Sequence, residues 1–185
     1  MVDNNKIIQK THKQDLLMSS LNNFYQNNKH LNYILNILNG NSKISLRIID
    51  WFVTNYSKKF NIHYKLNNNT FNVYINYKLQ LKGYSKKQFD PFCRRDRIEF
   101  YYNENEYIIT TVGQLNFFRW TFINNIIDYI EQHLYIIEKD MNNSYKTIYN
   151  VNNKVNNKRR KRHELSISAT RSITKNNVKI IVSFD

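Results

Sequence analysis

Apolar residues recur at three- and four-residue intervals over two N-terminal stretches of the chain, which is the spacing of amphipathic helices. Over residues 15–38 this pattern predicts one long helix or two short ones, ended by Gly40. Over residues 43–59 it predicts a further helix. Ser42 can cap that helix, because a serine hydroxyl accepts a hydrogen bond from a free backbone amide of the first turn.

Strict alternation of apolar and polar residues predicts β-strands farther along the chain. The alternation is clearest over residues 71–82, which should form one long half-buried strand. The same alternation over residues 96–102 and 106–111, on both sides of an Asn-Glu-Asn turn, predicts a β-hairpin. We expect these strands to form one antiparallel sheet.

A third helical segment is predicted over residues 113–139. Thr111 and Gln114 have the spacing of a capping box, in which the Thr hydroxyl and the Gln side chain each satisfy a backbone amide at the helix start. The first half of the segment is apolar on nearly every side, so it should be the most buried helix. The expected fold class is α+β, with an antiparallel sheet packed against amphipathic helices.

The distribution of apolar and polar residues divides the chain into four parts. Residues 1–12 are polar and should form a flexible N-terminus, and residues 13–140 should form the α+β core domain. Residues 141–163 have few apolar positions and are rich in Asn, Lys and Arg, which favours a basic linker. Residues 164–185 end in alternating apolar and polar positions, which predicts a C-terminal strand that joins the core sheet.

Charge adds an expectation about partners. The 185 residues hold 28 Lys and Arg against 14 Asp and Glu, a net charge of +14. No fold requires such an excess, and it causes self-repulsion. A polyanionic partner is therefore expected, with nucleic acid ahead of an anionic membrane surface or an acidic protein.

The densest charge cluster consists of five consecutive cations close to the C-terminus. These are Lys158, Arg159, Arg160, Lys161 and Arg162. Such a cluster can neutralise nucleic-acid phosphates, since each contact releases condensed counterions. It can also act as a nuclear import signal, or simply be a solvated linker.

A second basic region covers residues 78–97 and interleaves cations with aromatic residues. Its candidate nucleic-acid contacts are Lys86, Lys87, Arg94 and Arg95. Interleaving of this kind can build a groove in which cations hold phosphates and rings stack on bases. The alternative is a basic loop whose aromatic residues anchor it to the core.

Catalytic and metal-binding patterns are weak. Asp90 and Asp96 can pair with neighbouring arginines, and a metal-dependent nuclease would need them to converge with Glu99 around an ion. The single cysteine, Cys93, allows neither an internal disulfide nor a cysteine-based zinc site. The five His residues form no i,i+4 pair, and no glycine-rich phosphate loop occurs. We predict no catalytic residue, metal or cofactor.

Nothing in the chain predicts secretion or membrane insertion. The first residues lack the apolar core of a secretory signal, and no apolar run reaches the roughly 18 residues that a membrane span needs. We expect an intracellular, soluble protein with no transmembrane segment.

Four segments stand out together: SLRIIDWFVTNYSKK (45–59), KGYSKKQFDPFCRRDRIEFYY (82–102), TTVGQLNFFRW (110–120) and the ending SISATRSITKNNVKIIVSFD. With these segments the chain resembles a family of uncharacterised proteins of giant nucleocytoplasmic DNA viruses. The abundance of Asn, Ile and Lys is similar to that of mimivirus relatives. The resemblance implies a setting in the cytoplasmic virus factory or the virion, and it transfers no functional residue.

The leading hypothesis is a non-enzymatic protein that binds the phosphate backbone of DNA or RNA with little base specificity. One alternative is a virion structural or scaffolding protein that binds acidic protein or membrane partners. A further alternative is a metal-dependent enzyme acting on nucleic acid. The oligomeric state stays open.

Overall fold

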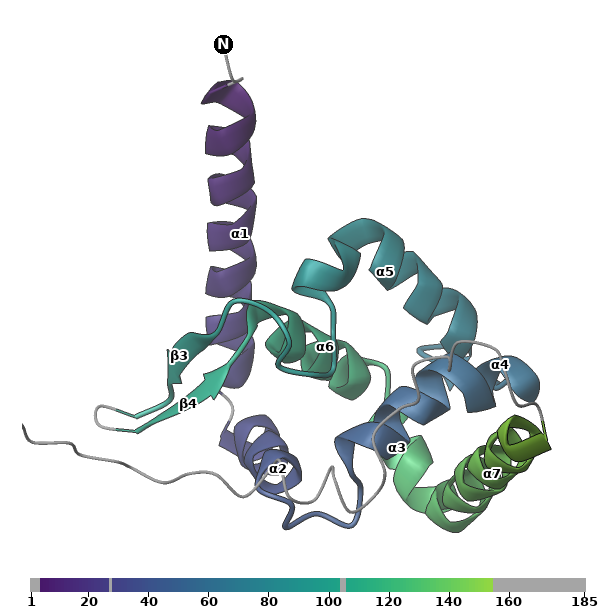
Figure 1. The fold of residues 1–185 in the computed structure, drawn as a ribbon. Helices are drawn as coiled ribbons and strands as arrows, with labels where there is room; N and C mark the ends of the chain where they lie inside the picture. Colours follow the sequence, from purple (N-terminus) through teal and green to yellow (C-terminus); the bar gives the residue numbers. More distant parts are fainter. Residues whose placement is uncertain (1–3, 27, 104–105, 155–185) are drawn as a thin grey trace, which may run out of the picture.

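The computed structural model describes residues 4–26, 28–103 and 106–154. Its elements, in chain order, are α1 (Asn4–Tyr25), α2 (Asn28–Leu38), α3 (Leu46–Trp51), the π-helical turn η1 (Phe52–Tyr56), α4 (Ser57–Lys59), β1 (His63–Leu66), β2 (Asn69–Asn72), α5 (Val73–Gln88), β3 (Ile98–Tyr101), β4 (Tyr107–Thr110), α6 (Val112–Ile123) and α7 (Ile126–Lys154). Helix α6 lies at the centre, with the other helices and the β3–β4 hairpin around it (Figure 1). The fold class is α+β, as predicted.

The strands form two small antiparallel pairs instead of the single sheet that we expected. In one pair β1 runs beside β2, with His63 opposite Asn72. In the other pair β3 runs beside β4, with Ile98 opposite Thr110. The predicted hairpin is therefore confirmed, and the prediction that it shares a sheet with residues 71–82 is wrong.

The predicted strand over residues 71–82 is a helix for most of its length. Only its first two residues belong to β2, and α5 begins at Val73. An alternating pattern also places apolar residues at i and i+4, so a helix can bury Val73 and Tyr77 on one side. The side chain of Asn72 favours the helix, because its Oδ1 accepts a hydrogen bond from the amide of Ile75 at 3.0 Å and caps the first turn.

The N-terminal helical pattern is confirmed as two helices, α1 and α2. Gly40 follows them with a φ of +75°, the left-handed conformation that ends a helix. The next helix begins at Leu46, later than predicted, because Ser45 caps it by accepting from the amide of Ile48. Ser42 instead accepts from the amide of Ile44 in the preceding turn.

The predicted helix over residues 113–139 is two helices, α6 and α7. Asn125 has a φ of +53°, and this left-handed residue breaks the helical hydrogen-bond ladder between them. Helix α6 is the most buried, as predicted, and Thr111 caps it by accepting from the amide of Gln114 at 3.1 Å. The hydroxyl of Tyr25 ties α1 to α6 by donating to the carbonyl of Leu115 at 2.6 Å.

The ends of the chain depart in part from the predicted segments. Helix α1 already begins at Asn4, within the predicted flexible terminus. Helix α7 continues to Lys154, through the first part of the predicted linker. The remainder of that linker, the cluster from Lys158 to Arg162 and the predicted C-terminal strand lie outside the described residues. The four-part division of the chain stays a prediction.

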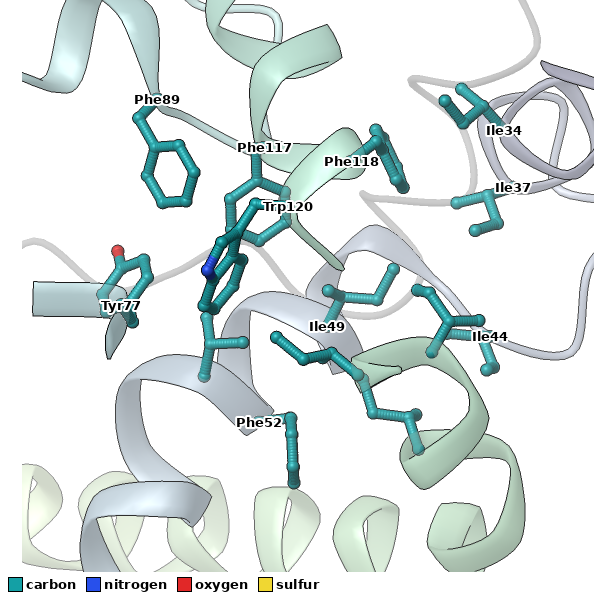
Figure 2. Packing of buried hydrophobic residues seen from close by; sticks show 14 of the residues in the cluster. Ile34, Ile37, Ile44, Ile49, Phe52, Tyr77, Phe89, Phe117, Phe118 and Trp120 are labelled. Atoms are coloured by element: carbon teal, nitrogen blue, oxygen red, sulfur yellow. The ribbon is translucent and has the colours of Figure 1, made fainter. Parts of the chain in front are cut away.

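Aromatic side chains fill much of the core around α6 (Figure 2). The ring centroid of Phe89 lies 5.3 Å from that of Phe117 and 5.4 Å from that of Trp120. Phe89 itself is 1% exposed, although it follows the polar end of α5. This anchor fixes the segment after α5 against α6, and that segment carries two of the predicted binding residues, Arg94 and Arg95.

Candidate nucleic-acid interface

Positive charge concentrates between residues 57 and 98, all of which the structure describes. This segment holds ten Lys and Arg residues against two acidic residues, Asp90 and Asp96. It runs from α4 through the β1–β2 pair and α5 into the loop before β3. A dense cationic segment is the electrostatic signature of a polyanion contact.

Three cations of this segment, Lys58, Lys78 and Lys82, form what we call the α5 ridge. Lys78 and Lys82 are exposed and lie one helical turn apart on α5. Tyr74 precedes Lys78 by one turn, and the Nζ atom of Lys58 lies 5.6 Å from the centroid of its ring. The cation–π contact therefore adds a charge from α4 to the α5 row.

The helix changes direction after this ridge. Ser85 has φ 60° and ψ 168°, which is not helical, and its Oγ accepts from the amide of Lys87 at 3.4 Å. Lys86 and Lys87 follow this break and are both exposed. These two predicted binding residues therefore do not continue the straight row of the ridge.

Arg94 is held in place by a buried carboxylate. Its Nε donates to Oδ2 of Asp90 at 3.0 Å, and its Nη2 donates to Oδ1 at 2.7 Å. The side chain of Asp90 is 8% exposed and that of Arg94 is 66% exposed. The guanidinium also lies 4.9 Å from the ring centroid of Phe92. The hydrogen bonds to Asp90 raise the pKa of Arg94 and hold its guanidinium in place. The loop therefore presents an oriented positive charge to solvent.

The loop that carries Arg94 is anchored to the start of α6. The amide of Asp90 donates to the carbonyl of Gly113 at 3.2 Å, and Nε2 of Gln114 donates to the carbonyl of Pro91 at 2.8 Å. The other end of the Gln114 amide accepts from the hydroxyl of Thr110 at 2.8 Å. The predicted capping box is therefore half correct, because Gln114 binds the loop and β4 in place of its own helix start.

Cys93 lies next to Arg94 and is only partly buried. Burial raises the pKa of its thiol, and the neighbouring Arg97 opposes that shift. A thiol with a raised pKa is a poor nucleophile at neutral pH. The surroundings of Cys93 therefore do not favour a reactive thiolate.

Three aromatic residues in or beside the second basic region face inward, whereas Phe92 lies against the guanidinium of Arg94. Tyr77 is 9% exposed and Phe89 is 1% exposed. Tyr84 is half-buried, with its ring stacked on Phe89 at a centroid distance of 6.4 Å. These rings anchor the segment to the core, which was the alternative to their stacking on bases.

Four of the predicted binding residues are exposed, two on each side of the buried stretch from Phe89 to Pro91: Lys86, Lys87, Arg94 and Arg95. Lys158, Arg159, Arg160, Lys161 and Arg162 lie outside the described residues. The sequence did not indicate Lys58, whose contact with Tyr74 depends on tertiary packing. Lys78 and Lys82 become a recognisable pair only once residues 73–88 are known to be helical.

The proposed metal ligands are not brought together. Asp90 is engaged by Arg94, and Oε2 of Glu99 accepts from the hydroxyl of Tyr101 at 2.7 Å. Within residues 4–154, apart from the gaps given above, no group of three or more His, Cys, Asp and Glu is arranged to hold a metal ion. None of the helices in that part is long and apolar enough to cross a membrane.

Fold and surface together define a mainly helical α+β protein with a cationic segment over residues 57–98. Residues 2–185 match the family of unknown function DUF7197, so the chain belongs to that family. It is similar to the uncharacterized protein L507 of Acanthamoeba polyphaga mimivirus, with 46% identity over 127 residues. That alignment covers 64% of this chain and 49% of the relative, so it spans about half of the relative's length. The search of solved structures found no match.

These comparisons confirm the resemblance to uncharacterised proteins of giant viruses that the sequence segments indicated. The family is described as one of unknown function, so it contributes no functional residue, and the link to a virus comes from the mimivirus relative.

Proposed function

We propose that the chain is a non-enzymatic nucleic-acid-binding protein that holds the phosphate backbone. The contacts would be made by the α5 ridge and by the cations of residues 86–95. One observation carries the proposal. Residues 57–98 contain ten cations and only two acids, and one of those acids holds Arg94 in place. Phosphate contacts of this kind position a strand and contribute little sequence specificity.

The aromatic contacts support a backbone-binding mode. Tyr74 faces the ammonium of Lys58 and Phe92 faces the guanidinium of Arg94, so both rings serve cations. Tyr77 and Phe89 are buried. A surface of cations without stacking rings suits a duplex, in which the bases are already stacked.

The viral family suggests where such binding would operate. A giant-virus protein could meet nucleic acid in the cytoplasmic virus factory or inside the virion. The cluster from Lys158 to Arg162 would add five further cations to the same electrostatic contact.

The test is fluorescence anisotropy with duplex DNA, single-stranded DNA and RNA, using the full chain. Three variants are compared with it: one neutralised at Lys158 to Arg162, one at Lys78 and Lys82, and one at both. The proposal expects each neutralisation to weaken binding and the combination to weaken it most. Equal affinity in all four proteins would overturn it.

A second candidate, a virion structural or scaffolding protein, is favoured by exposed apolar side chains outside the ridge. Tyr135 and Ile136 on α7 are 74% and 54% exposed. Tyr101 and Tyr107 pair across the hairpin at a ring centroid distance of 5.2 Å, and both are exposed. Exposed apolar groups of this kind suit protein contacts. Stoichiometric protein association that survives nuclease treatment would favour this candidate.

A further inference from the structure

A groove with both polar and apolar lining lies between α1, α5 and α6, with a volume of about 460 Å³. Its lining residues are Ser20, Phe24, Asn76, Gln80, Asn116, Arg119, Trp120, Ile123 and Asn124. None of them is acidic, and Arg119 supplies the only charge. The volume falls within the range of small-molecule sites, and the charge favours an anionic ligand.

Arg119 is positioned in the groove before any ligand binds. Its Nη1 donates to Oγ of Ser20 at 2.7 Å, and its Nη2 donates to Oδ1 of Asn116 at 2.8 Å. Asn116 is 1% exposed, and its own amide donates to the carbonyl of Gln88 at 2.9 Å. Two of the five guanidinium N–H donors are thus used to orient the group, and three remain for a ligand.

Three amide side chains offer both donors and acceptors in the same groove. Asn76 accepts from Nε1 of Trp120 at 2.7 Å, which leaves its NH₂ group as a donor. Asn124 donates to the carbonyl of Trp120 at 2.8 Å, which leaves its side-chain oxygen as an acceptor. Gln80 makes no side-chain hydrogen bond to another described residue, so both ends of its amide are available.

Apolar surface borders these polar groups. Phe24 is half-buried and stacks on His30 at a ring centroid distance of 4.7 Å. Ile123 is 57% exposed at the groove, and the indole of Trp120 forms part of its wall. A flat ring with a hydrogen-bonding edge would find apolar contact here, and its edge would find amides.

We propose that this groove binds a nucleotide. The amides of Asn76, Gln80 and Asn124 take the edge of the base, and Arg119 takes the phosphate. The nucleotide is either a free mononucleotide or one unpaired unit of a strand. The groove is distinct from the ridge, because Asn76 and Gln80 lie on a different face of α5 from Lys78 and Lys82.

The first arm of the test is calorimetric titration of the full chain with AMP, GMP, CMP and UMP, with ribose 5-phosphate as the ligand that lacks a base. Gln80→Glu places a carboxylate in the groove without removing an existing contact. Gln132→Glu makes the same change at an exposed position of α7. We expect a mononucleotide to bind more tightly than ribose 5-phosphate, with affinity reduced about tenfold or more by Gln80→Glu and unchanged by Gln132→Glu.

The second arm uses a single-stranded oligonucleotide and its abasic counterpart with the same number of phosphates. One outcome is that the native chain binds the strand with bases more tightly than the abasic strand, and that Gln80→Glu abolishes this preference. If no mononucleotide binds, this result identifies the ligand as one unpaired unit of a strand. The inference is overturned if neither ligand pair shows a base preference, or if the preference is unchanged in Gln80→Glu. Lys78→Gln with Lys82→Gln should leave mononucleotide affinity unchanged, which separates this inference from the proposed backbone contact.

Discussion

The buried carboxylate of Asp90 holds the exposed guanidinium of Arg94 through two hydrogen bonds of 3.0 and 2.7 Å. Oδ1 of Asp90 also accepts from the amide of Phe92 at 3.3 Å, so the same acid shapes the loop. Arg94 thereby loses much of its side-chain freedom before it meets a ligand. A loop with a strong positive charge thus uses one of its two acids to orient a cation.

Replacing this acid should destabilise the fold. Asp90→Asn keeps the shape of the side chain and removes the charge, so we expect the free energy of unfolding to fall by about 1–3 kcal/mol. Urea unfolding measures the change. Asp96→Asn removes an exposed acid from the same loop and serves as the control, with an expected change within about 0.5 kcal/mol. Equal effects of the two substitutions would contradict the assigned role of Asp90.

Two glycines should respond in opposite directions to alanine. A Cβ atom at Gly113 would lie 3.0 Å from the carbonyl oxygen of Lys87 and 3.3 Å from the amide nitrogen of Phe89. Gly113→Ala should therefore lower the free energy of unfolding by about 1–3 kcal/mol. A Cβ atom at Gly83 meets nothing within 4 Å, and Gly83→Ala should raise stability by about 0.5–1 kcal/mol. Thermal unfolding of both variants checks the pair, and a stable Gly113→Ala protein would contradict the close approach of the loop to α6.

The cap of α6 should be measurable by itself. Thr111→Ala removes the hydroxyl that accepts from the amide of Gln114, and we expect a loss of about 1 kcal/mol. Thr111→Ser retains the hydroxyl and should lose clearly less. Chemical denaturation of both proteins distinguishes the cap from simple loss of side-chain volume, which would give similar losses in the two variants.

His30 should make stability depend on pH. Its ring lies against Phe24 and Phe122, at centroid distances of 4.7 and 4.8 Å, and its buried Nδ1 has no hydrogen-bond partner among the described residues. Burial, with a smaller contribution from Lys29, lowers the pKa of His30 below its usual value of 6.5. The unfolded chain therefore binds this proton more readily, so stability falls as the pH drops below about 6.5 and is fully present above it.

His30→Phe preserves a flat ring against Phe24 and Phe122 and removes the titration. The stability of this variant relative to the native protein should therefore be greater at about pH 5.5 than at about pH 7.5. Urea unfolding at the two pH values measures this difference. A constant difference between the two proteins would show that His30 does not titrate as proposed.

Local signals explain what the sequence could predict about the fold. The β3–β4 hairpin follows from alternation on both sides of a polar turn, and the start of α6 follows from the hydroxyl of Thr111. The alternating pattern over residues 71–82 led to a wrong strand prediction, because Val73 and Tyr77 fit one face of a helix as well as one face of a strand. The cap at Asn72 favours the helical alternative, and Asn125 interrupts a helical segment whose apolar pattern continues past it.

Tertiary packing explains what the sequence could not predict about the sites. Charge density located Arg94, and its proximity in sequence to Asp90 suggested the ion pair. The contact between Lys58 and Tyr74 joins two separate elements, and the groove around Arg119 needs three helices to meet. No local sequence pattern predicts these contacts between separate elements, since each residue alone resembles an ordinary surface or core position.

The most direct test of the central claim is the salt dependence of duplex-DNA binding by the Lys78→Gln, Lys82→Gln double variant. If both cations contact phosphates, the slope of log affinity against log salt should become shallower by about 1.8, or about 0.9 for each lost contact. Lys43→Gln with Lys139→Gln removes the same charge away from α5 and should leave the slope nearly unchanged. An equal change of slope in the two double variants would contradict the account, since binding would then depend on net charge alone.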